Sequence, residues 1–211
     1  MKKLILTLSM GTICMFCLSI GGYSQVQIKV GPEAGFGWST LTSKYAGERT
    51  TYIGVNGQFG VGAEIKLADM FALRPSLMFN SKACLNTDDL FDNGNTTITL
   101  NTITLPVTAV LRKEFRNSSN FFVGFGPTIG YTISGKVKDD SGSESLKFGS
   151  DKDLKPFELG INGKLGFQFK NNLYLQFYGN AGINNRSTTN GGVFKAHDVW
   201  GFGIGYLFGG K

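Results

Sequence analysis

Apolar residues occupy every second position over most of the chain from Gln27 onward. In the first such segment, Ile28, Val30 and Phe36 share one set of alternate positions, and polar residues and glycines fill the other set. Later segments repeat this pattern, without the 3.6-residue period of an amphipathic helix. Because successive side chains of a strand point to opposite faces, the pattern predicts eight two-faced β-strands. They are expected at residues 27–39, 53–67, 71–82, 103–112, 121–134, 157–169, 173–183 and 199–208.

The segments between these strands alternate between short and long. The short ones are expected at residues 68–70, 113–120 and 170–172, and the long ones at residues 42–52, 83–97, 136–153 and 185–196. The long segments are rich in Thr, Asn, Gly, Asp and Ser, which favour loops. Short turns at one end and long loops at the other are typical of small outer-membrane barrels. The expected fold class is all-β, an eight-stranded antiparallel up-and-down transmembrane β-barrel with both termini on the periplasmic, short-turn side.

Glycine indicates which face points outward. A soluble barrel such as a lipocalin keeps its apolar face inward, whereas a membrane barrel turns that face toward lipid. The other face carries many glycines, from Gly31 to Gly205, and such a stripe would weaken the solvent face of a soluble barrel. Inside a narrow eight-stranded barrel, glycine leaves room for neighbouring side chains. The sequence therefore favours the membrane barrel over the soluble one.

Residues 1–24 have the layout of a secretory signal peptide. A positively charged start precedes an apolar run from Leu4 to Ile20, and Gly22 and Ser24 supply the small residues of a cleavage site. An uncleaved transmembrane anchor is the alternative, at the lower edge of the length that spans a bilayer. The predicted organisation is a signal peptide at residues 1–24 followed by an outer-membrane β-barrel domain at residues 25–211.

Composition narrows the function classes. Charged residues make up 17% of the chain, which is low for a soluble domain, and the 30 glycines are about twice the usual share. Cleavage of the signal peptide would leave Cys84 as the one cysteine, so no intramolecular disulfide is expected. The net charge is positive, but no basic run with interleaved aromatic residues is present. Nucleic-acid binding is therefore not expected.

Charged residues on the glycine-rich face are expected to point into the barrel. They are Lys29, Glu33, Glu64, Lys66, Arg74, Lys82, Arg112, Glu158 and Lys164. A conducting pore lined by charged rings is one interpretation. The favoured interpretation is a narrow lumen plugged by a structural charge network, because buried charges need partners and eight strands leave no wide channel.

Barrel closure predicts where the aromatic girdles lie. The last strand is expected to pair with the first, because an open sheet edge would leave backbone groups unsatisfied in lipid. Trp38 and Trp200 then both lie on the apolar face toward the long loops. Tryptophan prefers the membrane interface, so these two residues are predicted to be neighbours in the outer girdle. Tyr206 and Phe208 are predicted to mark the periplasmic girdle.

No catalytic residue, metal site or cofactor is expected. The Asp/Asn-rich residues 88–95 offer oxygen ligands for Ca²⁺, but they lack the glutamate that ends an EF-hand loop, and such clusters are common in turns. His197, the one histidine, has Ser187 and Asp198 nearby in the sequence, as a lipid hydrolase would require. Asp198 follows directly in the same strand and would face away from His197. The chain is therefore not predicted to be an enzyme.

Short motifs along the predicted strands form a recognisable set. They are Lys29-Val30-Gly31, Ala34-Gly35, Gly62-Ala63-Glu64, Leu73-Arg74-Pro75-Ser76-Leu77, Leu105-Pro106-Val107, Phe125-Gly126-Pro127, Phe157-Glu158-Leu159-Gly160 and Gly203-Ile204-Gly205-Tyr206-Leu207-Phe208. Together they resemble the PorT-like outer-membrane β-barrel family of Bacteroidetes. The resemblance implies a small barrel in the cell outer membrane. For at least one relative, the family name implies an accessory role in secretion.

Three function classes remain open. The first is a structural or interaction barrel whose exposed loops contact ligands or partner proteins. The second is an accessory factor for the secretion or maturation of surface proteins, and the third is a small pore or a lipid-acting enzyme. The expected partners are outer-membrane lipids and lipopolysaccharide, the barrel-assembly machinery during insertion, and a surface or secretion-system protein.

Overall fold

The computed structural model describes residues 27–45, 47–86, 96–116, 118–139, 142–150, 152–189 and 191–209. The predicted signal peptide and the Asp/Asn-rich residues 88–95 lie outside these ranges. No helix within them is long and apolar enough to cross a membrane. The strands are β1 (Gln27–Tyr45), β2 (Glu48–Lys66), β3 (Phe71–Asn86), β4 (Thr97–Glu114), β5 (Asn120–Asp139), β6 (Gly142–Ser145), β7 (Phe157–Gln168), β8 (Leu173–Gly182) and β9 (Val193–Tyr206).

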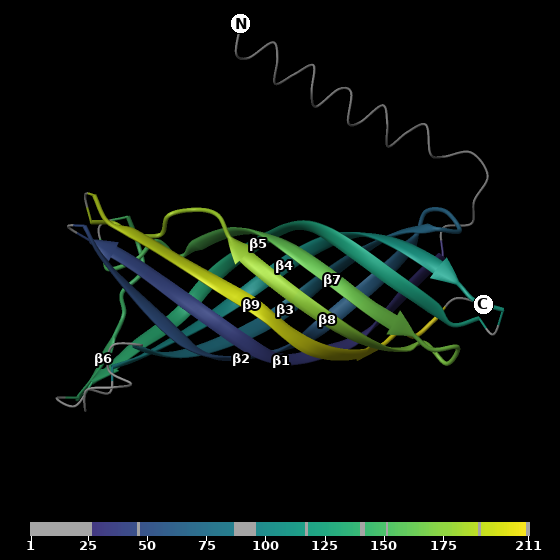
Figure 1. The fold of residues 1–211 in the computed structure, drawn as a ribbon, viewed down its shortest axis with the longest axis horizontal. Coiled ribbons are helices and arrows are strands. Elements are labelled where there is room, and N and C mark those ends of the chain that lie inside the picture. Colours follow the sequence, from purple (N-terminus) through teal and green to yellow (C-terminus); the bar gives the residue numbers. More distant parts are fainter. Residues whose placement is uncertain are drawn as a thin grey trace, which may run out of the picture.

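Eight of these strands close into an antiparallel ring in the order β1-β2-β3-β4-β5-β7-β8-β9 (Figure 1). The ring closes because β9 pairs with β1 from Glu33↔Gly205 to Lys44↔Val193. The short strand β6 pairs with the far end of β5. Figure 1 shows β6 at one end of the barrel and the C-terminal end of β9 at the other. The predicted eight-stranded antiparallel barrel is confirmed.

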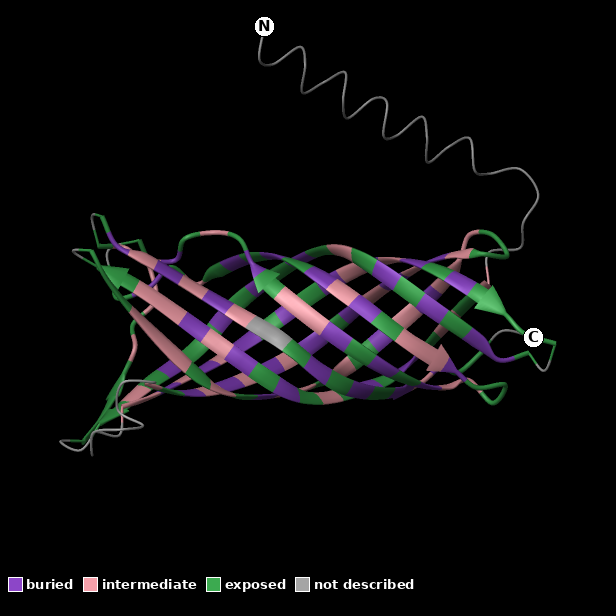
Figure 2. Cartoon of the chain, viewed as in Figure 1, coloured by how far each residue is buried: buried purple, intermediate pink, exposed green. Residues whose placement is uncertain are grey.

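Side chains alternate between the outside and the inside along each strand, which gives the striped pattern of Figure 2. On the outside, Phe36, Phe125 and Phe202 are exposed. On the inside, Glu64 and Arg74 are buried. The apolar face therefore points outward and the polar face inward, as the glycine pattern predicts.

Several inward glycines are required by the close approach of neighbouring strands. A Cβ added to Gly126 would overlap the backbone carbonyl oxygen of Val107 on β4, and one added to Gly31 would overlap that of Tyr206. These contacts involve backbone, which cannot move without breaking the strand pairing. The narrow ring therefore depends on glycine at these positions.

The strands continue well past their predicted ends on the side of the long loops. The β1–β2 ladder runs without interruption to Tyr45↔Glu48, so the loop predicted at residues 42–52 is wrong. The β3–β4 ladder likewise reaches Leu85↔Thr97, and β5 reaches Asp139. Hydrogen-bonded pairing therefore continues into segments that the sequence pattern predicts as loops.

We call the parts of the strands beyond the apolar band, such as residues 40–45 of β1, the loop-end extension. In this extension the alternation of β1 reverses, so that apolar residues point inward and polar residues point outward. The outward face of β1 is apolar up to Trp38, whereas the next outward residues are Thr40 and Thr42. The inward residues Leu41 and Leu100 are fully buried. They belong to an apolar cluster, here called the loop-end core, which contains Leu41, Cys84, Ile98, Leu100, Leu154, Phe194 and Ala196. On β1, the extension thus has the polar-out, apolar-in pattern of a protein in water.

Candidate functional site

The lumen at the short-turn end contains a carboxylate held by two guanidinium groups. Arg74 donates to Glu64 through its Nε at 2.7 Å and also through Nη2, and Arg112 Nη1 donates to Glu64 Oε1 at 2.8 Å. The guanidinium of Arg74 also lies 4.0 Å from the centre of the Phe122 ring, a cation–π contact. Glu64, Arg74 and Arg112 come from β2, β3 and β4, so their ion pairs tie three adjacent strands together.

A second carboxylate, that of Glu33 on β1, reaches across the lumen. Lys164 Nζ on β7 lies 3.0 Å from its Oε1, and the Gln176 amide donates to the same oxygen at 2.7 Å. The Tyr174 hydroxyl and the Ser76 hydroxyl each donate to Oε2 at 3.1 Å. All five residues are buried, so Glu33 links opposite walls of the barrel.

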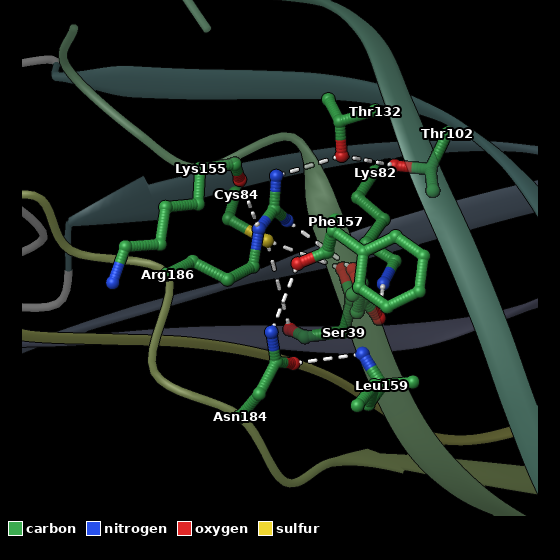
Figure 3. A network of polar contacts seen from close by, with 11 residues as sticks. Ser39, Lys82, Cys84, Thr102, Thr132, Lys155, Phe157, Leu159, Asn184 and Arg186 are labelled. Carbon is green, nitrogen blue, oxygen red and sulfur yellow. Dashed lines mark hydrogen bonds and ion pairs between the residues drawn. The ribbon is translucent and has the colours of Figure 1, made fainter. Parts of the chain in front are cut away.

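The third carboxylate, Glu158 on β7, pairs with Lys82 and Arg186, which Figure 3 shows beside Thr132. Its Oε1 lies 3.5 Å from Lys82 Nζ, and its Oε2 accepts a hydrogen bond from Arg186 Nη1 at 3.2 Å. Arg186 also donates to the Thr132 hydroxyl at 2.7 Å and to the backbone oxygen of Lys155 at 3.0 Å. Burial lowers the pKa of the Arg186 guanidinium, and the Glu158 carboxylate opposes that shift.

Arg186 is a member of this network that sequence reasoning missed. It lies in the segment between β8 and β9, which the sequence predicts as a long loop, and Arg186 is only 1% exposed. The segment is fixed at β7 by Asn184, which accepts a hydrogen bond from the Leu159 amide at 2.7 Å and donates one to the Phe157 carbonyl at 2.9 Å. The only sequence signal was an isolated arginine in a polar segment.

Two of the predicted lumen residues lie near the short-turn end of the barrel. Lys66 pairs with Asp69 at 3.0 Å, and the Asp69 side chain is 96% exposed, so this ion pair lies apart from the buried ion pairs of the lumen. Lys66 ends β2 where the next residues turn back, and its amine reaches the turn. Lys29 is half-buried and donates to Asn172 Oδ1 in the β7–β8 turn at 2.8 Å.

A small cavity remains beside the Glu33 group. It measures about 20 Å³ and is lined by Glu33, Lys164, Asn162 and Tyr178 among others. A cavity of this size holds about one water molecule. Asn162 spans part of the space, with its amide donating to the Gly126 carbonyl at 2.8 Å.

Two aromatic pairs lie on the outer wall, one near the middle of β9 and one at its C-terminal end. Trp38 and Trp200 are cross-strand partners whose ring centres lie 4.4 Å apart, and Phe177 lies 5.4 Å from Trp200. Tyr206 and Phe208 form a second pair with ring centres 4.7 Å apart, at the short-turn end of the chain's last strand. The neighbouring arrangement of the two tryptophans is present, and their depth in a membrane stays a prediction.

Part of the segment predicted as a long loop at residues 136–153 packs onto the loop-end core. Leu154 is 7% exposed and belongs to that core, and Leu146 and Phe148 pack against it. Two backbone hydrogen bonds hold the segment, from the Gly149 amide to the Leu154 carbonyl at 3.0 Å and from the Lys155 amide to the Arg186 carbonyl at 2.8 Å. This segment therefore covers the loop end of the barrel.

Of the residues considered for catalysis, the side chains of His197 and Ser187 belong to the described part of the chain. His197 is half-buried and is the cross-strand partner of Thr40, whereas the Ser187 hydroxyl accepts a hydrogen bond from the Thr189 amide at 3.2 Å. Among the described residues, no three His, Cys, Asp or Glu side chains gather so that they could hold a metal ion.

A closed antiparallel ring with an apolar outer face is the architecture of outer-membrane barrels. A family model described as an outer membrane protein beta-barrel domain matches residues 23–187. The chain belongs to this family. This match confirms the outer-membrane location that the sequence predicts.

Among solved structures, one of the similar outer-membrane proteins, OprG, shares the fold of this chain. The outer membrane protein OprG from Pseudomonas aeruginosa is 15% identical, with 88% of this chain and 96% of that chain covered and a TM-score of 0.53. Neisserial surface protein A is 9% identical, with coverages of 86% and 97% and a TM-score of 0.44. Ail of Yersinia pestis is 12% identical, with coverages of 85% and 98% and a TM-score of 0.40. The search of curated proteins gives no match.

Proposed function

We propose that this protein is an outer-membrane barrel with a plugged lumen whose loop-end extension serves as a structural or interaction surface outside the cell. The observation that carries the proposal is the set of buried ion pairs across the lumen. Glu33 joins β1 to β7, and Glu158 joins β7 to β3 and to the segment that holds Arg186. These groups occupy the space through which ions would pass.

The loop-end core supports the same proposal. Leu41, Leu100 and Phe194 are buried where a porin would have an open, hydrated mouth. Leu154 and Phe148 add a covering segment. The loop-end core and its covering segment hold the outer residues of the extension in place. A fixed outer surface suits contact with a partner better than the passage of solute.

Planar bilayers test the plugged lumen. We expect the reconstituted protein to give no steady single-channel conductance, because Lys82, Arg186 and Glu158 are paired across the space. Folded protein is verified in the same sample by its resistance to unfolding without heating. Ion-selective conductance that rises with the amount of folded protein would favour the small-pore alternative. Release of fatty acid from outer-membrane lipids, lost in His197→Gln, would favour the enzyme alternative.

An inserted epitope tag tests the orientation. A tag placed after Asp139, at the exposed end of β5, is expected to be tolerated and labelled by antibody on intact cells. The matched control is a tag after Asn171 in the short β7–β8 turn, which should be labelled only after the cells are opened. A tag after Leu154 should reduce the folded amount, because Leu154 is part of the loop-end core. Labelling of the Asn171 tag on intact cells would contradict the orientation.

An accessory role in secretion is the second candidate, and it is supported by the PorT-like motifs such as Leu105-Pro106-Val107. Deletion of the gene followed by proteomics of the cell surface and the culture medium separates the two candidates. Loss of many surface proteins, restored by the wild-type gene, would favour the secretion role. Loss of binding to one ligand or surface, with the secreted proteins unchanged, would favour the interaction role.

A further inference from the structure

Three cations lie together on the outer wall at the loop end, just above the apolar band. Lys44 on β1 and Arg49 on β2 are cross-strand partners, and Lys195 on β9 is the partner of Thr42, next along β1 from Lys44. By alternation from the outward Trp38, all three point away from the lumen. Lys44 and Arg49 are exposed and Lys195 is half-buried. We call Lys44, Arg49 and Lys195 the basic patch.

The basic patch lacks compensating charge among the described residues. The outward positions beside it include Thr42 and Thr51, together with Val193, the β9 partner of Lys44, and the Thr40–His197 pair. None of these is an acid, and the nearest acid of the hairpin, Glu48, is the partner of Tyr45 on the other face. The ion pairs of the described residues include none of the three cations. Like charges placed directly opposite each other across a strand pair destabilise it. An anionic ligand would remove that repulsion.

A groove of about 590 Å³ begins next to the basic patch and runs down the outer wall. Thr40 and His197, which are cross-strand partners, line one end. Phe125, in the first half of β5, lines the other end. Gly163 and Gly179, which are partners across β7 and β8, line the groove between these ends. The groove therefore leads from the polar extension into the apolar band.

The packing of the chain does not require Gly163. A Cβ added to it would meet nothing nearer than the Gly124 carbonyl oxygen at 4.0 Å, whereas one added to the inward Gly126 would overlap backbone. A side chain at position 163 would fill the groove without disturbing the barrel. The groove is thus a feature of the lipid-facing surface and not a by-product of ring closure.

We propose that the basic patch and the groove together bind one phosphorylated glycolipid of the lipopolysaccharide type from the outer leaflet. Its phosphates contact Lys44, Arg49 and Lys195, and one acyl chain lies over Gly163 and Gly179. The charge of the basic patch and its position both favour this ligand. Cations near a membrane surface attract anionic lipid headgroups, and the Trp38–Trp200 pair, which favours the interface, lies between the patch and the apolar band.

This proposal rests on the orientation that we propose, with the loop-end extension outside the cell. It gives a binding site to lipopolysaccharide, which is one of the expected partners. A soluble polyphosphate would need only the cations, and it would leave the groove without a role. A protein partner would need an apolar contact outside the membrane, whereas the groove descends toward Phe125 within the apolar band. A phosphorylated lipid uses both features.

Native mass spectrometry of the detergent-solubilised full barrel with bisphosphorylated lipid A tests the headgroup contact. The wild-type protein is expected to retain one lipid A molecule. The triple variant Lys44→Gln, Arg49→Gln, Lys195→Gln is expected to bind it about 100-fold more weakly. The matched control is Lys113→Gln, Arg116→Gln, Lys170→Gln, which removes three exposed cations from the short-turn end and should bind as the wild type does. Equal binding by the two triple variants would overturn the proposal.

A second pair of variants tests the acyl-chain contact. Gly163→Leu fills the groove and is expected to weaken lipid A binding about tenfold, roughly the value of the few methylene contacts it displaces. Gly57→Leu is its control, because Gly57 also faces outward with nothing within 4 Å of an added Cβ. Tight binding of inositol hexaphosphate, or lipid A binding that Gly163→Leu leaves unchanged, would overturn the proposal. Channel conductance would contradict the plugged lumen and leave the lipid site standing.

Discussion

Replacing Glu64 by glutamine is expected to destabilise the barrel by about 3–5 kcal/mol. The substitution leaves the guanidinium groups of Arg74 and Arg112 buried without a countercharge, and both now hydrogen-bond to the Glu64 carboxylate. The free energy of unfolding, measured by urea denaturation in lipid vesicles, checks the prediction.

Lys66→Gln is the matched control for this experiment. Lys66 is the last residue of β2 and pairs with the exposed Asp69 in the short turn. Loss of this ion pair is expected to cost no more than about 1 kcal/mol. Equal destabilisation by Glu64→Gln and Lys66→Gln would contradict the claim that the inner ion pairs hold the strands together.

Replacing Gly126 by valine is expected to prevent the ring from closing. A side chain there would overlap the carbonyl oxygen of Val107 on β4, and that backbone cannot move without loss of the β4–β5 pairing. The measurement is the fraction of protein that resists unfolding in detergent before heating, which should fall to near zero.

Gly57→Val makes the same chemical change at a glycine of the outer wall. Nothing lies within 4 Å of a Cβ added at Gly57, and valine has a higher strand propensity than glycine. This variant is expected to fold as the wild type does. Failure of both variants to fold would show that glycine is needed for a reason other than close approach of the strands.

Much of the barrel could be predicted because the alternation of apolar and polar residues shows, for each residue, which face of the strand its side chain lies on. The apolar outer face, the inward glycines such as Gly126, and the burial of Glu33, Glu64 and Arg74 all followed from the period-two pattern. Closure of β9 onto β1 followed from the need to pair sheet edges in lipid. These inferences needed no knowledge of long-range packing.

The rest depended on contacts that alternation does not report. In the loop-end extension the pattern continues, but its sense reverses, so Leu41 and Leu100 point inward. The sequence therefore predicts a loop at residues 42–52, where the structure has paired strands. The position of Arg186 depends on how the segment after β8 folds back over β7, and no periodic pattern encodes that. Lys66 has inward parity but lies at the end of its strand, where Asp69 offers a partner in the turn.

The reversal of sense along β1 can be measured directly with spin labels. Single cysteines at Phe36, Thr42 and Leu41 of a Cys84→Ser protein would carry nitroxides in reconstituted vesicles. We predict that the Phe36 label collides with oxygen dissolved in lipid, that the Thr42 label collides with a water-soluble nickel complex, and that the Leu41 label is shielded from both. Oxygen-dominated collisions at Thr42, or free access of the nickel complex to Leu41, would contradict an apolar band that ends near Trp38 beneath a closed, apolar loop-end core.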